Sequence, residues 1–363
     1  MAIPSNIDAH AKPPAAIKEV YKKFQKLDAA KLDEQHPDLL DLSSSSARND
    51  DLVQVSHIRE LPCDLRQVFL DFLTSSADHI TSREARGNLH GHQQRTTVYE
   101  FKILPGLYIY PSLLPPAVQL ALLDKLLHRD LSNPQHKTNV HMHYDVPYPA
   151  STPVGDGDSS ASRSSFFNSA AMDLVFPPKD PNTHKAITTS QFLSKKLRWM
   201  TLGGQYDWTA KQYPSTAPPP FPADVKGLID CLFPFMKAEA AILNLYAPGD
   251  TLSLHRDVSE ECSAPLVSVS LGCDGVFVCG LEGADGQARV VAMRLKSGDA
   301  VVMSGEARYA WHGVPRVVAG TCPEFLGEWP SRGQTDGDVE RFAMWKGWMA
   351  GKRINLNVRQ MFA

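Results

Sequence analysis

Short apolar runs separated by Gly and Asp dominate the chain from residue 240 onward. The runs are rich in Val, Ile and Leu, and they lie at residues 242–246, 266–271, 276–278, 290–293, 300–303 and 354–358. Turn-forming pairs such as Gly249-Asp250 and Gly298-Asp299 stand between them. Many short strands joined by such turns are typical of an antiparallel sandwich or jelly roll. We therefore predict a mainly β core within an α+β fold class.

Helical periodicity marks parts of the chain before this β region. Pro13-Pro14 precedes apolar residues spaced by three or four positions, which predicts a helix over residues 15–32 that packs on the core. Leucines at similar spacing predict a second helix over residues 116–129, after a strand-like run at 106–110. The first part of the chain is therefore expected to add helices to the β core.

Loop-forming composition separates these regions. Ser, Gly, Pro and Asp gather in segments that we expect at the surface, namely residues 42–51, 147–163 and 320–338. We divide the chain into a helical and loop N-terminal extension at residues 1–100, a middle segment with helices at 101–239, and the β core at 240–363.

The composition is that of an ordinary globular protein. The 363 residues are 43% hydrophobic and 21% charged, and the formal net charge of −3 argues against nucleic-acid binding through a globally basic surface. Local basic residues could still contact phosphates, or they could be solvated lysines on helix faces. These residues are Lys185, Lys195, Lys196, Arg198 and Lys211, with Lys346, Lys352 and Arg353 nearer the C-terminus.

Targeting and cysteine patterns set an expected compartment. No apolar run approaches membrane-spanning length, and the first residues lack the basic and apolar regions of a secretory signal. The six cysteines form no C-x-x-C pair, which favours reduced thiols over a zinc site or a disulfide framework. We expect a cytoplasmic or nuclear monomer that does not associate with membranes, and a mitochondrial location stays open.

The candidate chemistry begins with His255, Asp257 and His312. Residues i and i+2 of a strand point to the same side, so His255 and Asp257 can reach one ion if residues 252–255 form a strand that ends there. His312 lies in a second β-like run and would supply the third ligand. Two imidazoles and one carboxylate on one face leave positions open, as in non-haem Fe(II) oxygenases that bind a chelating co-substrate and O2. The alternative for His255 and Asp257 alone is a solvated pair without a metal.

A second pattern, Arg353, Asn355 and Arg359, has even spacing on the last predicted strand. These three side chains therefore share one face of the strand. A dicarboxylate bound to the metal needs donors for its far carboxylate, and a guanidinium supplies two in parallel. We assign Arg353 to that salt bridge and Asn244 and Tyr246 as neutral hydrogen-bond donors. The alternative is a cationic edge strand with solvated charges.

These residues resemble the AlkB-type Fe(II)/2-oxoglutarate dioxygenases. Their pattern N-x-Y…H-x-D…H…R-x-N-x-T-x-R is matched from Asn244 to Arg359, with Asn357 in place of the usual Thr. Residues 196–203, 238–244 and 312–317 resemble signature segments of the eukaryotic AlkB homologue 1 branch. The resemblance implies a double-stranded β-helix, which is a jelly roll, and a nucleotide-recognition lid in the middle segment.

The resemblance also implies the reaction and the roles of the residues. Fe(II) would be bound by His255, Asp257 and His312, with 2-oxoglutarate and O2 as co-substrates. Asn244, Tyr246, Arg353, Asn355 and Arg359 would line the 2-oxoglutarate and inner-pocket side. The implied activity is oxidative demethylation of N-methylated bases in RNA or DNA, with release of formaldehyde, succinate and CO2. N6-methyladenine and 1-methyladenine are the leading substrates, followed by 3-methylcytosine and modified tRNA cytosines.

Aromatic residues before the core are candidates for holding the base. An enzyme that acts on a base takes it out of the stack and commonly holds it between aromatic faces. Trp199, Tyr206 and Trp208 could do so, or they could be core aromatics beneath a loop. The resemblance to the family's lid favours Tyr206 or Trp208.

The sequence alone leaves other interpretations of the function open. The same iron chemistry could hydroxylate protein side chains, or the chain could be a non-catalytic nucleic-acid-binding scaffold. His141 and His143 also have metal-like spacing, but no third partner lies in a matching context. Glu260 and Arg316 could orient the iron ligands, with surface ion pairing as the alternative.

Overall fold

The structure is a computed structural model that describes most of the chain. The described residues are 11–28, 30–33, 36–42, 53–59, 64–75, 89, 96–150, 164–207, 213–283, 286–330 and 341–362. Most of the predicted loops at 42–51 and 147–163, part of the loop at 320–338, and both Trp208 and Lys211 lie outside them. Among the described residues, no helix has the length and apolar character needed to cross a membrane.

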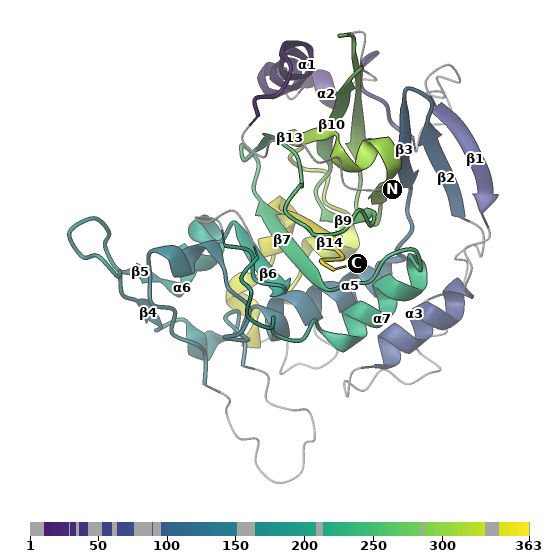
Figure 1. The fold of residues 1–363 in the computed structure, drawn as a ribbon. Helices are drawn as coiled ribbons and strands as arrows, with labels where there is room; N and C mark the ends of the chain where they lie inside the picture. The colour runs from purple at the N-terminus through teal and green to yellow at the C-terminus, as the bar shows by residue number, and fades with distance from the viewer. Residues whose placement is uncertain are drawn as a thin grey trace.

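Two antiparallel sheets face each other and form the predicted jelly roll (Figure 1). The smaller sheet has the order β11-β10-β13-β8. Its strands are β8 (Leu252–His255), β10 (Gly275–Glu282), β11 (Ala288–Leu295) and β13 (Trp311–Val317). In β13 and β8, His312 is the register partner of His255. This pairing brings together two histidines that are 57 positions apart in the sequence numbering.

The facing sheet is built around four strands in the order β12-β9-β14-β7. They are β7 (Ala240–Tyr246), β9 (Leu266–Gly272), β12 (Ala300–Met303) and β14 (Arg353–Arg359). Each of them contains one of the predicted β-like runs. The polar residues of β14 are spaced by even numbers of positions, so their side chains share one face of the sheet. Because β14 lies between β7 and β9, they lie in the middle of that face.

This sheet extends at both edges to eight strands. β1 (Val53–Arg59), β2 (Thr96–Phe101) and β3 (Leu104–Tyr110) continue it beyond β12, and β6 (Trp199–Gly203) pairs with β7 at the other edge. The N-terminal extension was expected to contain helices and loops, whereas β1 and β2 also lie in it. The sheet thus combines strands from all three predicted segments, whose boundaries stay predictions.

Apolar burial explains how the layers stay together. Between the sheets, Phe277, Met293 and Val301 belong to one buried cluster. The other face of the large sheet is covered by α3 (Leu65–Thr74), α5 (Pro116–Leu123) and α7 (Ala223–Leu232), which contribute to a second cluster (Figure 1). Each fully buried Leu, Val or Phe contributes about 1.5–3 kcal/mol, so these faces fix the sandwich strongly.

The first predicted helix is divided into two. α1 spans Ala15–Lys26 and α2 spans Ala30–Asp33, because Leu27 adopts an extended backbone conformation. Phe24 is buried with Val276 and Val278 on the outer face of the small sheet. The expected packing of this helix on the core is therefore confirmed, although a single helix over residues 15–32 is wrong.

The remaining elements are short. The predicted helix at 116–129 is α5 followed directly by a π-helical segment, η1 (Asp124–Asp130). β4 (Val175–Phe176) and β5 (Ile187–Thr188) form a separate two-stranded sheet that projects from the sandwich near β6 (Figure 1). The others are η2 (Asn139–Met142), η3 (Ser169–Ala171), α6 (Thr189–Gln191), η4 (Phe192–Lys196), η5 (Gly305–Tyr309), α8 (Glu324–Gly327), η6 (Ala343–Trp345) and η7 (Trp348–Gly351).

Candidate metal centre and its cavity

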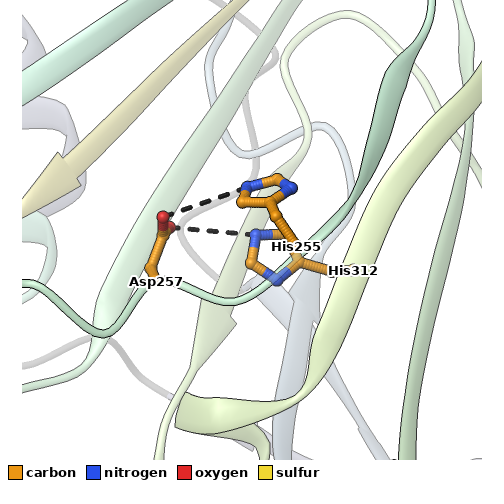
Figure 2. A group of neighbouring side chains, drawn as sticks. All are labelled: His255, Asp257 and His312. Carbon is orange, nitrogen blue, oxygen red and sulfur yellow. Dashed lines mark ion pairs between the residues drawn. The ribbon is translucent and has the colours of Figure 1, made fainter. Parts of the chain in front are cut away.

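His255, Asp257 and His312 meet at the open end of the small sheet. His255 is the last residue of β8, Asp257 follows in the next loop, and His312 is the second residue of β13. The Nε2 atoms of His255 and His312 lie 3.9 and 3.8 Å from the two oxygens of Asp257. Figure 2 shows the carboxylate facing one nitrogen of each imidazole. The three side chains predicted as ligands are therefore brought together.

The backbone fixes the orientation of both imidazoles. Nδ1 of His255 lies 2.9 Å from the carbonyl oxygen of Ser253, and Nδ1 of His312 lies 3.1 Å from that of Ala310. If each Nδ1–H donates to its carbonyl, the lone pair is left on Nε2, which is the nitrogen that faces Asp257. Burial, aided by the charge of His255, lowers the pKa of His312 to about 4. His312 is consequently neutral at pH 7, as a metal ligand must be.

Asp257 is held in its charged form by donors from β14. Arg359 Nη2 lies 3.3 Å and Asn357 Nδ2 lies 3.2 Å from the same carboxylate oxygen, Oδ2. Burial would raise the pKa of Asp257, but the charge of Arg359 outweighs it, aided by the two imidazoles once they are protonated in the acid range, and the pKa stays below its ordinary value. Asn357, which stands where the family has Thr, thus donates a hydrogen bond to the carboxylate of the predicted ligand Asp257.

The spacing of the three groups fits a metal ion. Metal bonds to imidazole nitrogen or carboxylate oxygen are about 2.0–2.2 Å long, as for zinc, so one ion can span two ligand atoms up to roughly 4 Å apart. One ligand atom from each residue lies within 4.8 Å of the other two, and the contacts to Asp257 are shorter than 4 Å. The donor set of two imidazoles and one carboxylate is that of Fe(II) sites with open positions.

The metal centre opens into a cavity of about 470 Å³ between the two sheets. One part of its wall is apolar and includes Ile242, Leu252, Leu266, Phe277, Leu295, Val301, Met303 and Val314. The other part carries hydrogen-bonding groups from the large sheet, namely Asn244, Ser268, Arg353, Asn355, Asn357 and Arg359. A largely apolar cleft with a few convergent polar groups is typical of a small-molecule site.

Arg353 is a buried cation in the wall of this cavity. Its exposed fraction is 1%, and its guanidinium donates to the carbonyl oxygens of Cys273 and Leu295 and, at 2.8 Å, to Ser270 Oγ. Nε is buried without a partner, and no carboxylate of the described residues forms an ion pair with this guanidinium. Burial lowers the pKa of Arg353, although Tyr246 and the carboxylates of Asp274 and Asp299, which lie beyond ion-pair distance, partly offset this effect. A buried guanidinium without a carboxylate is costly unless a ligand supplies one.

The predicted neutral donors lie beside Arg353. Tyr246 is its register partner on β7, so both side chains lie on the same face of the sheet, and the buried Tyr246 hydroxyl has no hydrogen-bond partner in the described part of the chain. Asn244 and Asn355 are register partners one step further along and line the cavity. Arg359 also lines it, but its guanidinium is committed to Asp257 and Glu260.

Two serines were missed by sequence reasoning. Ser270 Oγ accepts a hydrogen bond from Arg353, and Ser268 Oγ accepts one of 2.6 Å from Asn355. The signal was present, because Ser268 and Ser270 alternate with Val and Leu in an otherwise buried strand, β9. Polar residues at every second position of such a strand indicate a polar cavity on one face.

The aromatic candidates are placed differently from one another. Tyr206 lines the cavity, its hydroxyl lies 3.3 Å from Ser259 Oγ, and its ring packs edge-on against Tyr213, which was not predicted. Trp199 shares a sheet face with its register partner Asn244 but is not among the cavity-lining residues. Trp208 lies outside the described residues. Of the two described candidates, Tyr206 is therefore the one placed at the cavity.

Several other residues have structural roles. His141 Nδ1 accepts from the Thr138 backbone amide and its Nε2 contacts the Tyr148 hydroxyl, so both ring nitrogens are occupied. Of the two roles left open for Arg316, orienting the ligands is not supported, because it donates to the Gln25 carbonyl oxygen at α1. Lys185, Lys195, Lys196 and Arg198 are exposed, whereas burial removes Arg353 from the candidates for phosphate contact.

Comparison with known proteins identifies the family. Residues 106–359 match the 2OG-Fe(II) oxygenase superfamily. Over 276 residues the chain is 50% identical to the N6-methyladenosine RNA demethylase ALKB1 of Pyricularia oryzae, which covers 73% of this chain and 76% of that protein. It is 48% identical over 233 residues to the N6-methyladenosine RNA demethylase ALKBH of Cryphonectria parasitica, covering 61% and 99%. It is 35% identical over 272 residues to the tRNA demethylase abh1 of Schizosaccharomyces pombe, covering 73% and 82%.

The superfamily takes its name from Fe(II) and 2-oxoglutarate, and the chain carries a ligand set suited to the first and a buried guanidinium suited to the far carboxylate of the second. On this sequence match and this donor set, the chain belongs to the 2OG-Fe(II) oxygenase superfamily, in the AlkB-type group and on its AlkB homologue 1 branch.

Proposed function

We propose that this protein is an Fe(II)- and 2-oxoglutarate-dependent demethylase of N-methylated nucleobases in RNA or DNA. The observation that carries the proposal is the combination of the three-residue metal centre with Arg353, a buried guanidinium in the same cavity that lacks a carboxylate partner among the described residues. A dicarboxylate that reaches from the metal to Arg353 would satisfy both groups at once.

Each group of residues has a defined part in this reaction. His255, Asp257 and His312 would hold Fe(II), while Arg353 and Tyr246 would bind the far carboxylate of 2-oxoglutarate. When bound, the iron lets O2 oxidise 2-oxoglutarate to succinate and CO2 and hydroxylate the methyl group, which then leaves as formaldehyde. The apolar wall around Phe277 excludes water from the reacting groups.

The substrate class rests on the relatives and on the charge of the cavity. Two relatives are named as N6-methyladenosine RNA demethylases and a third as a tRNA demethylase. Asp257 is the single carboxylate among the described residues that line the cavity, and Arg359 and Asn357 already donate hydrogen bonds to it. Glu260, the next acid along the chain, is paired with Arg308 and Arg359. A neutral base such as N6-methyladenine therefore fits better than cationic 1-methyladenine, which would lack a free counter-charge.

Tyr206 is placed to contact such a base. It lies at the cavity with its ring supported by Tyr213 and its hydroxyl near Ser259. An aromatic face of this kind can stack on an extruded base, which typically contributes about 1–3 kcal/mol per base. The exposed basic residues near β6 would contact phosphates of the flanking strand.

The test uses RNA and DNA oligonucleotides that carry either N6-methyladenine or 1-methyladenine at one position of the same sequence. The protein, Fe(II), ascorbate and 2-oxoglutarate are added, and nucleosides and succinate are measured by mass spectrometry beside an H255A/D257A control. We expect the methyl group to be lost in the reaction with the unmodified protein and not in the reaction with the H255A/D257A variant. The loss should be faster from N6-methyladenine than from 1-methyladenine.

The outcomes separate the parts of the proposal. Succinate without any change in the bases would refute the nucleobase substrate and direct the search to protein side chains. No succinate would refute the 2-oxoglutarate assignment. Faster reaction with 1-methyladenine would refute the argument from cavity charge while leaving the demethylase assignment in place.

A further inference from the structure

Three buried charged residues form a network of contacts with Asp257. Glu260, Arg308 and Arg359 have side-chain exposed fractions of 0, 2 and 4%. They come from three segments. Glu260 lies in residues 257–264, which we call the ligand loop, Arg308 lies in η5 before His312, and Arg359 ends β14. We call these three residues the carboxylate clamp.

Arg308 fixes the backbone of the ligand loop. Its Nη1 donates to the carbonyl oxygen of Asp257 at 2.6 Å, and its Nε donates to that of Ala264 at 2.9 Å. Its Nη2 donates to Glu260 Oε2 at 2.9 Å. One guanidinium thus binds the start, the middle and the end of residues 257–264. Three charge-assisted hydrogen bonds from one buried group make this loop rigid.

Glu260 joins the two arginines. Its Oε1 lies 3.1 Å from Arg359 Nη1, and Arg359 Nη2 reaches Asp257 Oδ2 at 3.3 Å. The contacts form a closed ring from Asp257 through Arg359, Glu260 and Arg308 back to the Asp257 carbonyl. Two carboxylates and two guanidiniums make this ring formally neutral, which allows its burial.

The two carboxylate oxygens of Asp257 differ in the hydrogen bonds that they accept. Oδ2 accepts hydrogen bonds from Arg359 and Asn357 and lies 3.8 Å from His312 Nε2, whereas Oδ1 accepts none from the described residues and lies 3.9 Å from His255 Nε2. A carboxylate that could turn freely could offer both oxygens to an ion. Held by Oδ2, it keeps Oδ1 free of hydrogen bonds from the described residues and able to bind a metal ion.

We propose that Glu260 and Arg308 are positioning residues that act through Asp257. By holding Arg359 and the ligand loop, they keep the Asp257 carboxylate facing the Nε2 atoms of His255 and His312, with Oδ1 free to bind the metal. This proposal rests on the metal site of the proposed function. It assigns a role to two residues that do not themselves contact the predicted metal, 2-oxoglutarate or base.

The test compares E260Q and R308K with E306Q. Glu306 lies in the same η5 segment as Arg308, but its ion pair with Arg289 is largely exposed, with side-chain exposed fractions of 60 and 37%. Binding of Mn(II) to the metal-free protein is measured by calorimetry, together with the visible charge-transfer band of the Fe(II)–2-oxoglutarate complex without O2. The ratio of formaldehyde to succinate is measured with N6-methyladenine RNA.

We expect E260Q and R308K to weaken Mn(II) binding by at least about tenfold, as is typical when a partner of a metal ligand is lost. The charge-transfer band should shift and the ratio of formaldehyde to succinate should fall, while E306Q matches the unmodified protein in all three measurements. R308K retains the buried positive charge, so it provides the test if E260Q does not fold.

Two results would overturn the proposal. A folded E260Q or R308K variant with unchanged Mn(II) affinity, band and product ratio would show that the clamp does not position Asp257. Failure of the unmodified protein to bind Mn(II) would overturn it differently, because the metal site of the proposed function would then be wrong as well.

Discussion

Replacing Arg353 by Met tests the co-substrate site most directly. Met keeps much of the length and apolar volume of the side chain but removes the guanidinium that donates to Cys273, Leu295 and Ser270. In the unmodified protein this guanidinium is buried and lacks a carboxylate partner among the described residues. We expect the variant to retain the metal centre, because the three metal ligands do not hydrogen-bond to Arg353 in the described structure.

The magnitude follows from burial. Removing one partner of a buried ion pair costs about 3–5 kcal/mol, because the other charge is left without compensation. The Michaelis constant for 2-oxoglutarate should therefore rise by roughly 10²- to 4 × 10³-fold, at about 1.4 kcal/mol per factor of ten. A solvent-exposed pair would contribute less than about 1 kcal/mol, so the size of the effect also reports the burial.

The assay is a cycle of two proteins and two co-substrates. Succinate release from 2-oxoglutarate is compared with butyrate release from 2-oxopentanoate, which has the same chain length but no far carboxylate. The unmodified protein should strongly prefer 2-oxoglutarate, and R353M should lose that preference. If R353M weakens both co-substrates equally, Arg353 does not recognise the far carboxylate and the reasoning is refuted.

Three further predictions concern buried groups. Y246F should raise the unfolding free energy of the metal-free protein by about 1–2 kcal/mol, because it removes a buried hydroxyl without a partner among the described residues. It should also raise the Michaelis constant for 2-oxoglutarate about tenfold. Urea denaturation and succinate release measure the two effects, and a less stable variant would contradict the first. G275A should raise the Michaelis constant for 2-oxoglutarate by about five- to 100-fold, because the added methyl group lies 2.6 Å from Arg353 Nε and overpacking costs about 1–3 kcal/mol. The Mn(II) affinity serves as the control and should not change. Burial, with a smaller effect of the Arg341 charge, lowers the pKa of His128 to about 3, so His128 is neutral in the fold and charged below its ordinary pKa of 6.5 when unfolded. The unfolding free energy should thus fall by about 2 kcal/mol more in the unmodified protein than in H128F between pH 7.5 and pH 5, and equal slopes in urea melts would count against this.

Local periodicity determined much of what the sequence predicted. Side chains alternate along a strand, so the two-residue spacing of His255 and Asp257 and of Arg353 and Asn355 placed each pair on one face before any tertiary contact was known. The apolar runs likewise predicted the strands of the jelly-roll core, including β7, β9, β12 and β14. These features depend on neighbours within a few residues, which a sequence displays directly.

The tertiary structure decided which distant segments meet. Pairing of β13 with β8 places His312 opposite His255. The extra strands β1, β2 and β6 widen one sheet without a strong local signal, whereas β3 contains the strand-like run predicted at residues 106–110. The same holds for polar contacts, since Arg359 lies on Asp257 and Glu260, and Arg316 lies against α1. Residue types and their spacing predicted the ligands of the metal centre. The partners that hold those ligands come from loops and strands far apart in the sequence, so the packing of the two sheets alone determines them.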